Sequence, residues 1–366
     1  MNLKNLEKVF EDKPLFQSRQ AKEAIFRNLI DDWSQATNLP QALRQRLNQE
    51  CPLTIKAELF SSADKNSVKG LLILKDGLKA EAVLIRHQDG RNTVCVSSQI
   101  GCPLGCLFCA TGKMGFKRNL EATEIIEQVL LFARRLKENK STPCSPSLSK
   151  DKSLLRTQKN AAALPGQDKL QSKNNRINNI VFMGMGEPFL NYKNVLEAIK
   201  TINDKNGLNI GARHISISTV GITDGIEKLL NEPLQINLAI SLHAPNNLLR
   251  SKIIPINKKY PIEKIFAAVK KYIQKTSRRV MIEYIMIKGV NDAPAQAREL
   301  AALIKNNRLS PCFVNLISYN PTGIFRSSPS EKIKIFKKIL ENNKIAVTQR
   351  HHFGGQIKAA CGQLAN

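Results

Sequence analysis

The sequence predicts an α/β fold, a partial (β/α)6 barrel preceded by a small helical domain and a β-hairpin. From Val94 onward, short apolar runs alternate with helical stretches, and this order implies parallel strands. Before that point, Asp76-Gly77 separates two apolar runs, which is a strong hairpin signal. A chain of 366 residues is long enough for one large domain and one small one.

The expected elements follow the chain in order. Spaced apolar residues predict helices within 18–33, 40–47 and 120–135. The hairpin strands are expected at 70–74 and 82–85, and the barrel strands at 94–97, 180–183, 214–219, 236–241, 280–287 and 313–317. In such an architecture the functional groups lie at the C-terminal ends of the strands.

We divide the chain into four parts: a helical accessory domain (1–70), a hairpin extension (71–93), the barrel core (94–330) and a C-terminal helix, strand and tail (331–366). Residues 137–176 interrupt the core with a Ser-, Lys-, Asn- and Gln-rich stretch that has no apolar period. We expect a disordered insertion there. A tolerated surface insertion is favoured over an arm that contacts RNA.

The charge balance points to a polyanionic partner. Lysine and arginine number 56 against 30 acidic residues, a net charge of +26, which favours nucleic acid, although such an excess also serves solubility. The N-terminus has no signal-peptide core and no run is long enough to span a bilayer, so we expect a cytoplasmic protein without membrane contact. Eight cysteines in a chain of this length favour metal binding or chemistry over disulfides.

Three of these cysteines form a compact motif. Cys102, Cys106 and Cys109 have the spacing C-x3-C-x2-C, and three thiolates on one short loop suit three irons of a [4Fe–4S] cluster, leaving the fourth open. Zinc is the rival, but a structural zinc site needs four ligands. Only Cys95 is near enough in sequence to be the fourth. Gly184–Pro188 adds a glycine turn with one carboxylate, Glu187, suited to an ammonium group.

Together these motifs resemble the radical S-adenosylmethionine (SAM) superfamily. More specifically, five segments resemble the dual-specificity RNA methyltransferases of that superfamily: 95–102, 116–120, 184–188, 238–245 and 359–364. The resemblance implies methylation of C2 of adenine 2503 in 23S rRNA, in protein-free or early assembly form, and of adenine 37 in tRNAs. It also implies a monomer that uses two SAM molecules per turnover, one [4Fe–4S] cluster and an electron donor such as flavodoxin.

The same resemblance assigns three catalytic residues. Cys361 would accept a methyl group from the first SAM. The second SAM would yield a 5′-deoxyadenosyl radical that removes hydrogen from this S-methyl group, so that the carbon can add to adenine. Glu81 would then take the proton, and Cys95 would attack Cys361 to release the RNA with formation of a disulfide.

The resemblance also implies a SAM site made of Gly186, Glu187, Ser218, Ser241, Leu242, His243 and Asn320. The run before the tail cysteine departs from the family, because Gln356 and Lys358 stand where carboxylates are expected. Cys51, Cys144 and Cys312 match no motif, and we expect them to be structural. Two alternatives stay open: a related enzyme that methylates C8 of the same adenine, and a zinc-bound RNA-binding protein without catalysis.

Overall fold

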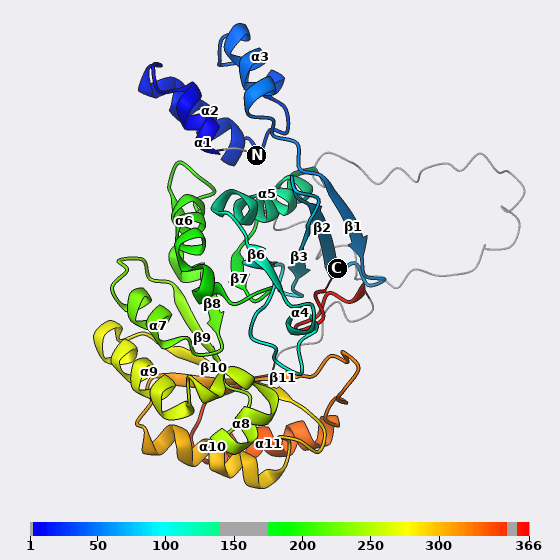
Figure 1. Ribbon diagram of the computed structural model, residues 1–366, viewed down its shortest axis with the longest axis vertical. Coiled ribbons are helices and arrows are strands. Elements are labelled where there is room, and N and C mark those ends of the chain that lie inside the picture. Colours follow the sequence, from blue (N-terminus) through cyan, green and yellow to red (C-terminus); the bar gives the residue numbers. More distant parts are fainter. Residues whose placement is uncertain (1–2, 139–174, 350–356, 366) are drawn as a thin grey trace, which may run out of the picture.

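In the computed structural model, residues 3–138, 175–349 and 357–365 are described (Figure 1). Most of the expected insertion, including Cys144, lies outside this part of the chain, as does Gln356. Ten strands form one sheet in the order β1-β2-β3-β4-β7-β8-β9-β10-β11-β12. Their bounds are β1 (Ala57–Ser61), β2 (Ser67–Ile73), β3 (Lys79–Arg86), β4 (Asn92–Val96), β7 (Asn179–Phe182), β8 (Ile215–Thr219), β9 (Asn237–Ser241), β10 (Val280–Met286), β11 (Cys312–Ser318) and β12 (Val347–Gln349).

The sheet confirms the predicted partial barrel. The six strands β4, β7, β8, β9, β10 and β11 run parallel, and β12 adds a seventh at the edge. Strands β1 to β4 are antiparallel and carry the predicted hairpin. Within the described residues β1 and β12 are not paired to each other, so the barrel is open.

Helices cover the sheet from outside (Figure 1). Those that follow the parallel strands are α5 (Ala122–Glu138), α6 (Tyr192–Asn203), α7 (Thr223–Leu230), α8 (Asn247–Ile253), α9 (Ile262–Thr276), α10 (Pro294–Asn306) and α11 (Ser330–Asn342). Their apolar faces and the strands enclose one large core. None of the helices in the described ranges is long and apolar enough to cross a membrane.

The N-terminal helices are α1 (Leu3–Val9), α2 (Leu15–Phe26) and α3 (Gln41–Glu50). The helix expected over 18–33 is shorter than predicted, because the chain turns at Leu29, whose φ is 54°. Ile30 and Trp33 are still buried, so the apolar spacing continued beyond the end of the helix. The sequence also missed β1 and a small second sheet of β5 (Gln99–Gly101) and β6 (Phe116–Asn119).

The hairpin presents two different faces. On one face Gly70 lets α5 approach closely, since a Cβ there would lie 2.9 Å from Cδ2 of Leu131. On the other face Val83, Ile85 and Cys95 form a small apolar cluster with Ala359 and Leu364 of the C-terminal tail. The tail, red in Figure 1, lies beside the short helix α4 (Ala110–Lys113). The hairpin that precedes the barrel core and the tail that follows it therefore meet on this face.

Candidate active site

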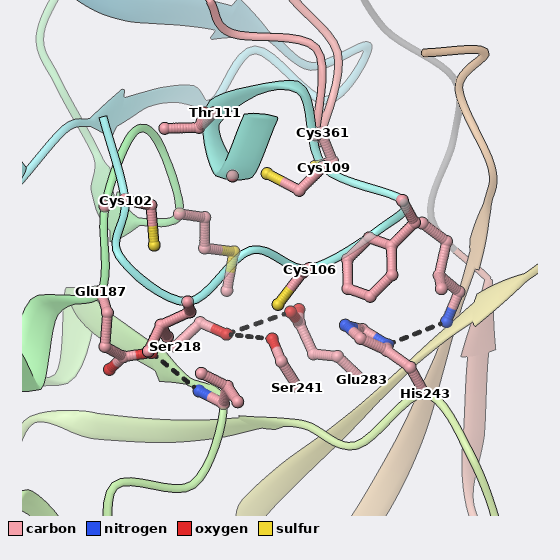
Figure 2. A pocket seen from close by; sticks show the side chains of 18 of the residues that line it. Cys102, Cys106, Cys109, Thr111, Glu187, Ser218, Ser241, His243, Glu283 and Cys361 are labelled. Carbon is pink, nitrogen blue, oxygen red and sulfur yellow. Dashed lines mark hydrogen bonds between the residues drawn. The ribbon is translucent and has the colours of Figure 1, made fainter. Parts of the chain in front are cut away.

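The cysteine loop and the strand ends enclose one cavity (Figure 2). Cys102, Cys106 and Cys109 line it from the loop between β5 and α4. The opposite wall comes from the C-terminal ends of successive strands, and its polar members are Glu187, Ser218, Ser241, His243 and Glu283. This is the edge at which a barrel fold places its functional groups, as the sequence predicts.

Backbone contacts fix the cysteine loop. Gly101 has a φ of 72°, and a Cβ there would lie 1.7 Å from the carbonyl oxygen of Gly115, so only glycine fits. The N–H of Cys102 donates to that same carbonyl at 3.1 Å. The N–H of Leu107 donates to the carbonyl of Ile253 at 3.0 Å. The loop is thus held both to the residue that precedes β6 and to the end of α8.

The arrangement of the three thiols suits ligands of one iron–sulfur cluster better than three cysteines without a shared function. All three sulfurs face the same cavity in Figure 2. Burial raises the pKa of Cys102 to about 12 and that of Cys106 well above its ordinary value. Thiolates there need positive charge nearby, which bound iron supplies. Among the described residues no three His, Cys, Asp or Glu side chains form a group suited to a single metal ion, whereas a cluster takes each thiolate on a different iron.

Glu187 is almost completely buried at the end of β7. Its two carboxylate oxygens accept hydrogen bonds from the N–H groups of Phe189, at 3.2 Å, and Val220, at 2.9 Å. Burial raises the pKa of this carboxyl to about 7, and the hydrogen bonds oppose that rise. Gly186 beside it has a φ of 95°, and a Cβ there would clash with Gln99. Glycine is therefore required here for the close approach to Gln99, and Gly186 also lines the cavity, as the sequence predicts.

Two serines and a carboxylate form a chain of hydrogen bonds. The hydroxyls of Ser218 and Ser241 are 3.1 Å apart, and the Ser218 hydroxyl donates to Oε2 of Glu283 at 3.2 Å. Figure 2 shows this chain along the floor of the cavity. The sequence did not single out Glu283. One acidic residue inside the otherwise apolar strand 280–287 was the signal that could have found it.

His243 is buried with a φ of 59°. Its Nδ1 accepts from the N–H of Ile285 at 3.1 Å, which assigns the ring hydrogen to Nε2. Burial, aided by the charge of Arg250, lowers the pKa of His243 to about 3. The imidazole is therefore a neutral ring that stacks edge-on against Phe108 at 4.8 Å, and it does not act as a cation.

Arg250 links two strand ends in the wall of the cavity by hydrogen bonds, a role that the sequence did not suggest. Its guanidinium is fully buried and donates to the carbonyls of Val220, Ser241 and Leu242, at the ends of β8 and β9. It makes no ion pair with a carboxylate in the part of the chain that the structure describes. Burial lowers the pKa of Arg250 to about 10, and the charge of Cys106 opposes that shift. The charge of a Cys106 thiolate therefore helps to keep Arg250 protonated.

The C-terminal tail closes the cavity, and Cys361 lines it together with the three loop cysteines. Hydrogen bonds from the barrel and from α4 hold the tail in place. The carbonyl of Cys361 accepts from Nδ2 of Asn320 at 3.0 Å, and that of Gly362 accepts from the N–H of Ala110 at 2.7 Å. The hydroxyl of Thr111 donates to the carbonyl of Leu364 at 2.6 Å.

The other predicted residues lie behind this cavity or beside it. The Leu242 side chain packs into the main core, while its N–H donates to the carbonyl of Glu283 at 3.1 Å. Asn320 holds the tail but does not line the cavity. Cys95 packs against the residues that flank Cys361. Glu81, on the same face of the hairpin, is buried and forms an ion pair with Lys69.

Comparison with known proteins agrees with this geometry. A family model for the radical SAM superfamily matches residues 96–301. The chain is 44% identical over 96% of its length to a probable dual-specificity RNA methyltransferase RlmN from Dictyoglomus thermophilum, of which it covers 91%. The chain belongs to the RlmN family of radical SAM methyltransferases.

Two further proteins show how far the likeness extends. A probable dual-specificity RNA methyltransferase RlmN from Chloroflexus aurantiacus is 40% identical over 100% of this chain and 91% of its own. The crystal structure of a radical SAM methyltransferase from Sphaerobacter thermophilus is 39% identical, with a TM-score of 0.85 over 99% of this chain and 97% of that one. The superfamily implies a [4Fe–4S] cluster and SAM as cofactors.

Proposed function

We propose that this protein methylates C2 of adenine 2503 in 23S rRNA, and C2 of adenine 37 in tRNAs, through a methyl group carried on Cys361. The observation that carries the proposal is the position of Cys361, which lines the same cavity as the three loop cysteines. The dual-specificity RNA methyltransferase names of the relatives support RNA as the substrate class. The charge of +26 suits such a polyanion.

In this proposal Cys102, Cys106 and Cys109 hold the cluster, and SAM binds against Gly186, Glu187, Ser218, the 241–243 segment and Asn320. When bound, the cluster supplies and takes back single electrons and, with SAM, generates the radical that removes hydrogen from the S-methyl group. Glu187 receives the ammonium group, since its carboxylate lies at the cavity wall. The neutral imidazole of His243 contributes a ring N–H.

The remaining steps use the residues of the hairpin face. The carbon radical on the Cys361 sulfur would bond to C2 of adenine, and Glu81 would take the proton from C2 while the C–H electron pair stays in the ring. The unpaired electron that the addition leaves in the ring would return to the cluster. The Cys95 thiolate then attacks the Cys361 sulfur. An S–S bond forms, the C–S bond breaks, and the released carbon keeps the electron pair and takes a proton to become the methyl group. An external thiol reductant restores both cysteines.

The same proposal extends to the oligomeric state, the location and the partners of the protein. We propose a monomer that works in the cytoplasm, where its RNAs are found, on protein-free or early assembly rRNA. It would take electrons from a donor such as flavodoxin and use two SAM molecules per turnover. The division of the chain at residues 70, 93 and 330 is likewise proposed.

Nucleoside analysis of RNA after reaction tests the function. Wild-type protein, reductant and SAM should convert 23S rRNA and tRNA to 2-methyladenosine, and Cys361→Ala should yield none. Cys312→Ala, which removes a thiol outside the cavity, is the matched control and should retain activity. 8-Methyladenosine would replace the C2 assignment by the C8 alternative. Stoichiometric zinc in a colourless protein without methylated product would support the non-enzymatic alternative.

A further inference from the structure

Lys69 and Glu81 form a buried ion pair on the hairpin. Nζ of Lys69 lies 3.0 Å from Oε1 of Glu81, and the exposed fractions of the two side chains are 13% and 1%. Carboxylates are rarely this buried, because moving the charge out of water costs on the order of several kcal/mol unless a cation compensates it. Lys69 is the cation that does so here.

The two oxygens of Glu81 differ in a way that matters for chemistry. Oε1 accepts the hydrogen bond from Lys69. Oε2 is buried and has no hydrogen-bond partner among the described residues. A buried carboxylate oxygen without a donor is uncommon, and its lone pairs remain available to accept a proton.

The strand register places this ion pair on the same face of the sheet as Cys95. Across the sheet, Phe60 on β1 faces Lys69 on β2, Lys69 faces Val83 on β3, and Val83 faces Cys95 on β4. Directly paired residues lie on the same face, and Glu81, two positions from Val83, shares it. The tail residues Ala359 and Leu364 pack on this face. The ion pair thus borders the place where Cys361 and Cys95 must meet.

The row also has an open end. Phe60 is exposed, and the ammonium group of Lys69 lies 5.5 Å from the centre of its ring. From this edge the polar groups run inward from Lys69 to Glu81 and Cys95. Lys69 is more exposed than Glu81 and therefore lies on the solvent side of the carboxylate, whereas Oε2 is buried.

We propose that Lys69 is a positioning residue for the proton transfer that precedes RNA release. It anchors Oε1 of Glu81 and compensates its charge, so that Oε2 faces the substituted adenine. In the step it supports, the C2–H bond breaks, an O–H bond forms at Oε2, and the electron pair stays in the adenine ring. The inference rests on the proposed function, because it takes Glu81 as the base and Cys361 as the methyl carrier.

The test follows the reaction by stage in the full-length holoenzyme. Lys69→Met removes the cation and keeps an unbranched side chain, and Lys69→Arg keeps the cation. Lys79→Met removes an exposed lysine from β3, the strand that carries Glu81. For each variant, protein mass spectrometry measures the methyl group on Cys361. Denaturing gels measure covalent protein–RNA adduct, and nucleoside analysis measures 2-methyladenosine.

The Lys69→Met variant should load the methyl group on Cys361 normally and then accumulate the covalent adduct. It should release product at least about 10-fold more slowly than wild type, because it loses a part of the ~10²–10⁴-fold acceleration that a general base supplies. Lys69→Arg should restore release to within a few-fold, and Lys79→Met should match wild type. Normal loading also shows that the variant is folded. If Lys69→Met does not fold, Lys69→Arg decides, because stalling in that charge-retaining variant contradicts the inference.

Cys95→Ala serves as the parallel arm that separates the two claims. If Cys95→Ala accumulates adduct while Lys69→Met releases RNA at the wild-type rate, the role of Lys69 is wrong and the proposed function stands. If wild type carries no methyl group on Cys361 and Cys95→Ala forms no adduct, the proposed function fails, and the role of Lys69 fails with it.

Discussion

The cavity wall and the hairpin face of this protein are organised in opposite ways. In the wall, the polar groups come from consecutive parallel strands, and backbone groups or Arg250 hold them. On the hairpin face, Glu81, Cys95 and the tail around Cys361 come from distant parts of the chain and meet through apolar packing and one ion pair.

This difference separates what the fold provides from what the particular reaction requires. A parallel sheet brings the ends of its strands together whatever the reaction. The hairpin face exists only because β2 and β3 extend that sheet and the C-terminal tail packs on them. We therefore expect changes in the wall to affect folding and cofactor binding, and changes on the hairpin face to stop the reaction after the cofactor has bound.

Among changes in the wall, we expect Arg250→Met to lower the free energy of unfolding the most. It leaves several buried carbonyls without donors, at a cost of about 1–3 kcal/mol for each group, so we expect a loss of at least about 3 kcal/mol. Urea unfolding measures it. Arg46→Met, which breaks an exposed pair with Glu50, is the control and should not shift the midpoint. A loss below about 1 kcal/mol for Arg250→Met would show that the wall does not depend on this residue.

A pH series sharpens the role of Glu187. Burial raises its pKa from 4.5 to about 7, so between those values the unfolded chain is ionised there while the folded, SAM-free protein holds a proton. The contribution of Glu187 to the free energy of unfolding therefore falls as pH rises from 4.5 to about 7. Binding of an ammonium group needs the carboxylate, so SAM affinity should fall by up to ~10-fold for each pH unit below 7.

Anaerobic equilibrium dialysis at several pH values measures that affinity. Glu187→Gln should bind SAM weakly at every pH and show no such slope. The neutral ring of His243, whose pKa is lowered to about 3, adds nothing in this range. A flat profile for the wild type would mean that Glu187 does not bind the ammonium group.

The smallest expected effect lies where the two regions meet, at Asn320. Its side chain donates to the carbonyl of Cys361 at 3.0 Å, a hydrogen bond worth about 1 kcal/mol. Asn320→Ala should therefore slow methyl loading of Cys361 about 5-fold at saturating SAM, measured by mass spectrometry in a single turnover. If only the affinity for SAM changes, Asn320 acts through the proposed SAM site alone, and its hydrogen bond to Cys361 does not contribute to methyl loading.

The sequence predicted the wall better than the hairpin face, for a physical reason. Strand periodicity and the glycine turn locate Glu187, and they predict the strand end at which the resemblance places Ser218, because strand ends are local features that the barrel brings together. Nothing local places Cys95 beside Cys361, and only the resemblance joined them. Arg250 and Lys69 were missed because a buried cation looks like any surface lysine or arginine until the fold shows its partners.

The boundary errors have similar causes. The helix expected to reach residue 33 ends at Phe26, although Trp33 is fully buried. Apolar spacing reports burial, and burial continued through a turn. Strand β1 was missed because four of its five residues are exposed, which leaves no clear alternation to detect.

The central claim is that the transferred carbon passes through Cys361 before it reaches RNA. The most direct measurement is mass spectrometry of Cys95→Ala after reaction with SAM, reductant and RNA, followed by protease and nuclease digestion. The account predicts a tail peptide in which one carbon joins the Cys361 sulfur to C2 of an adenosine. Normal turnover by Cys95→Ala, with unmodified Cys361 and methylated RNA, would contradict it.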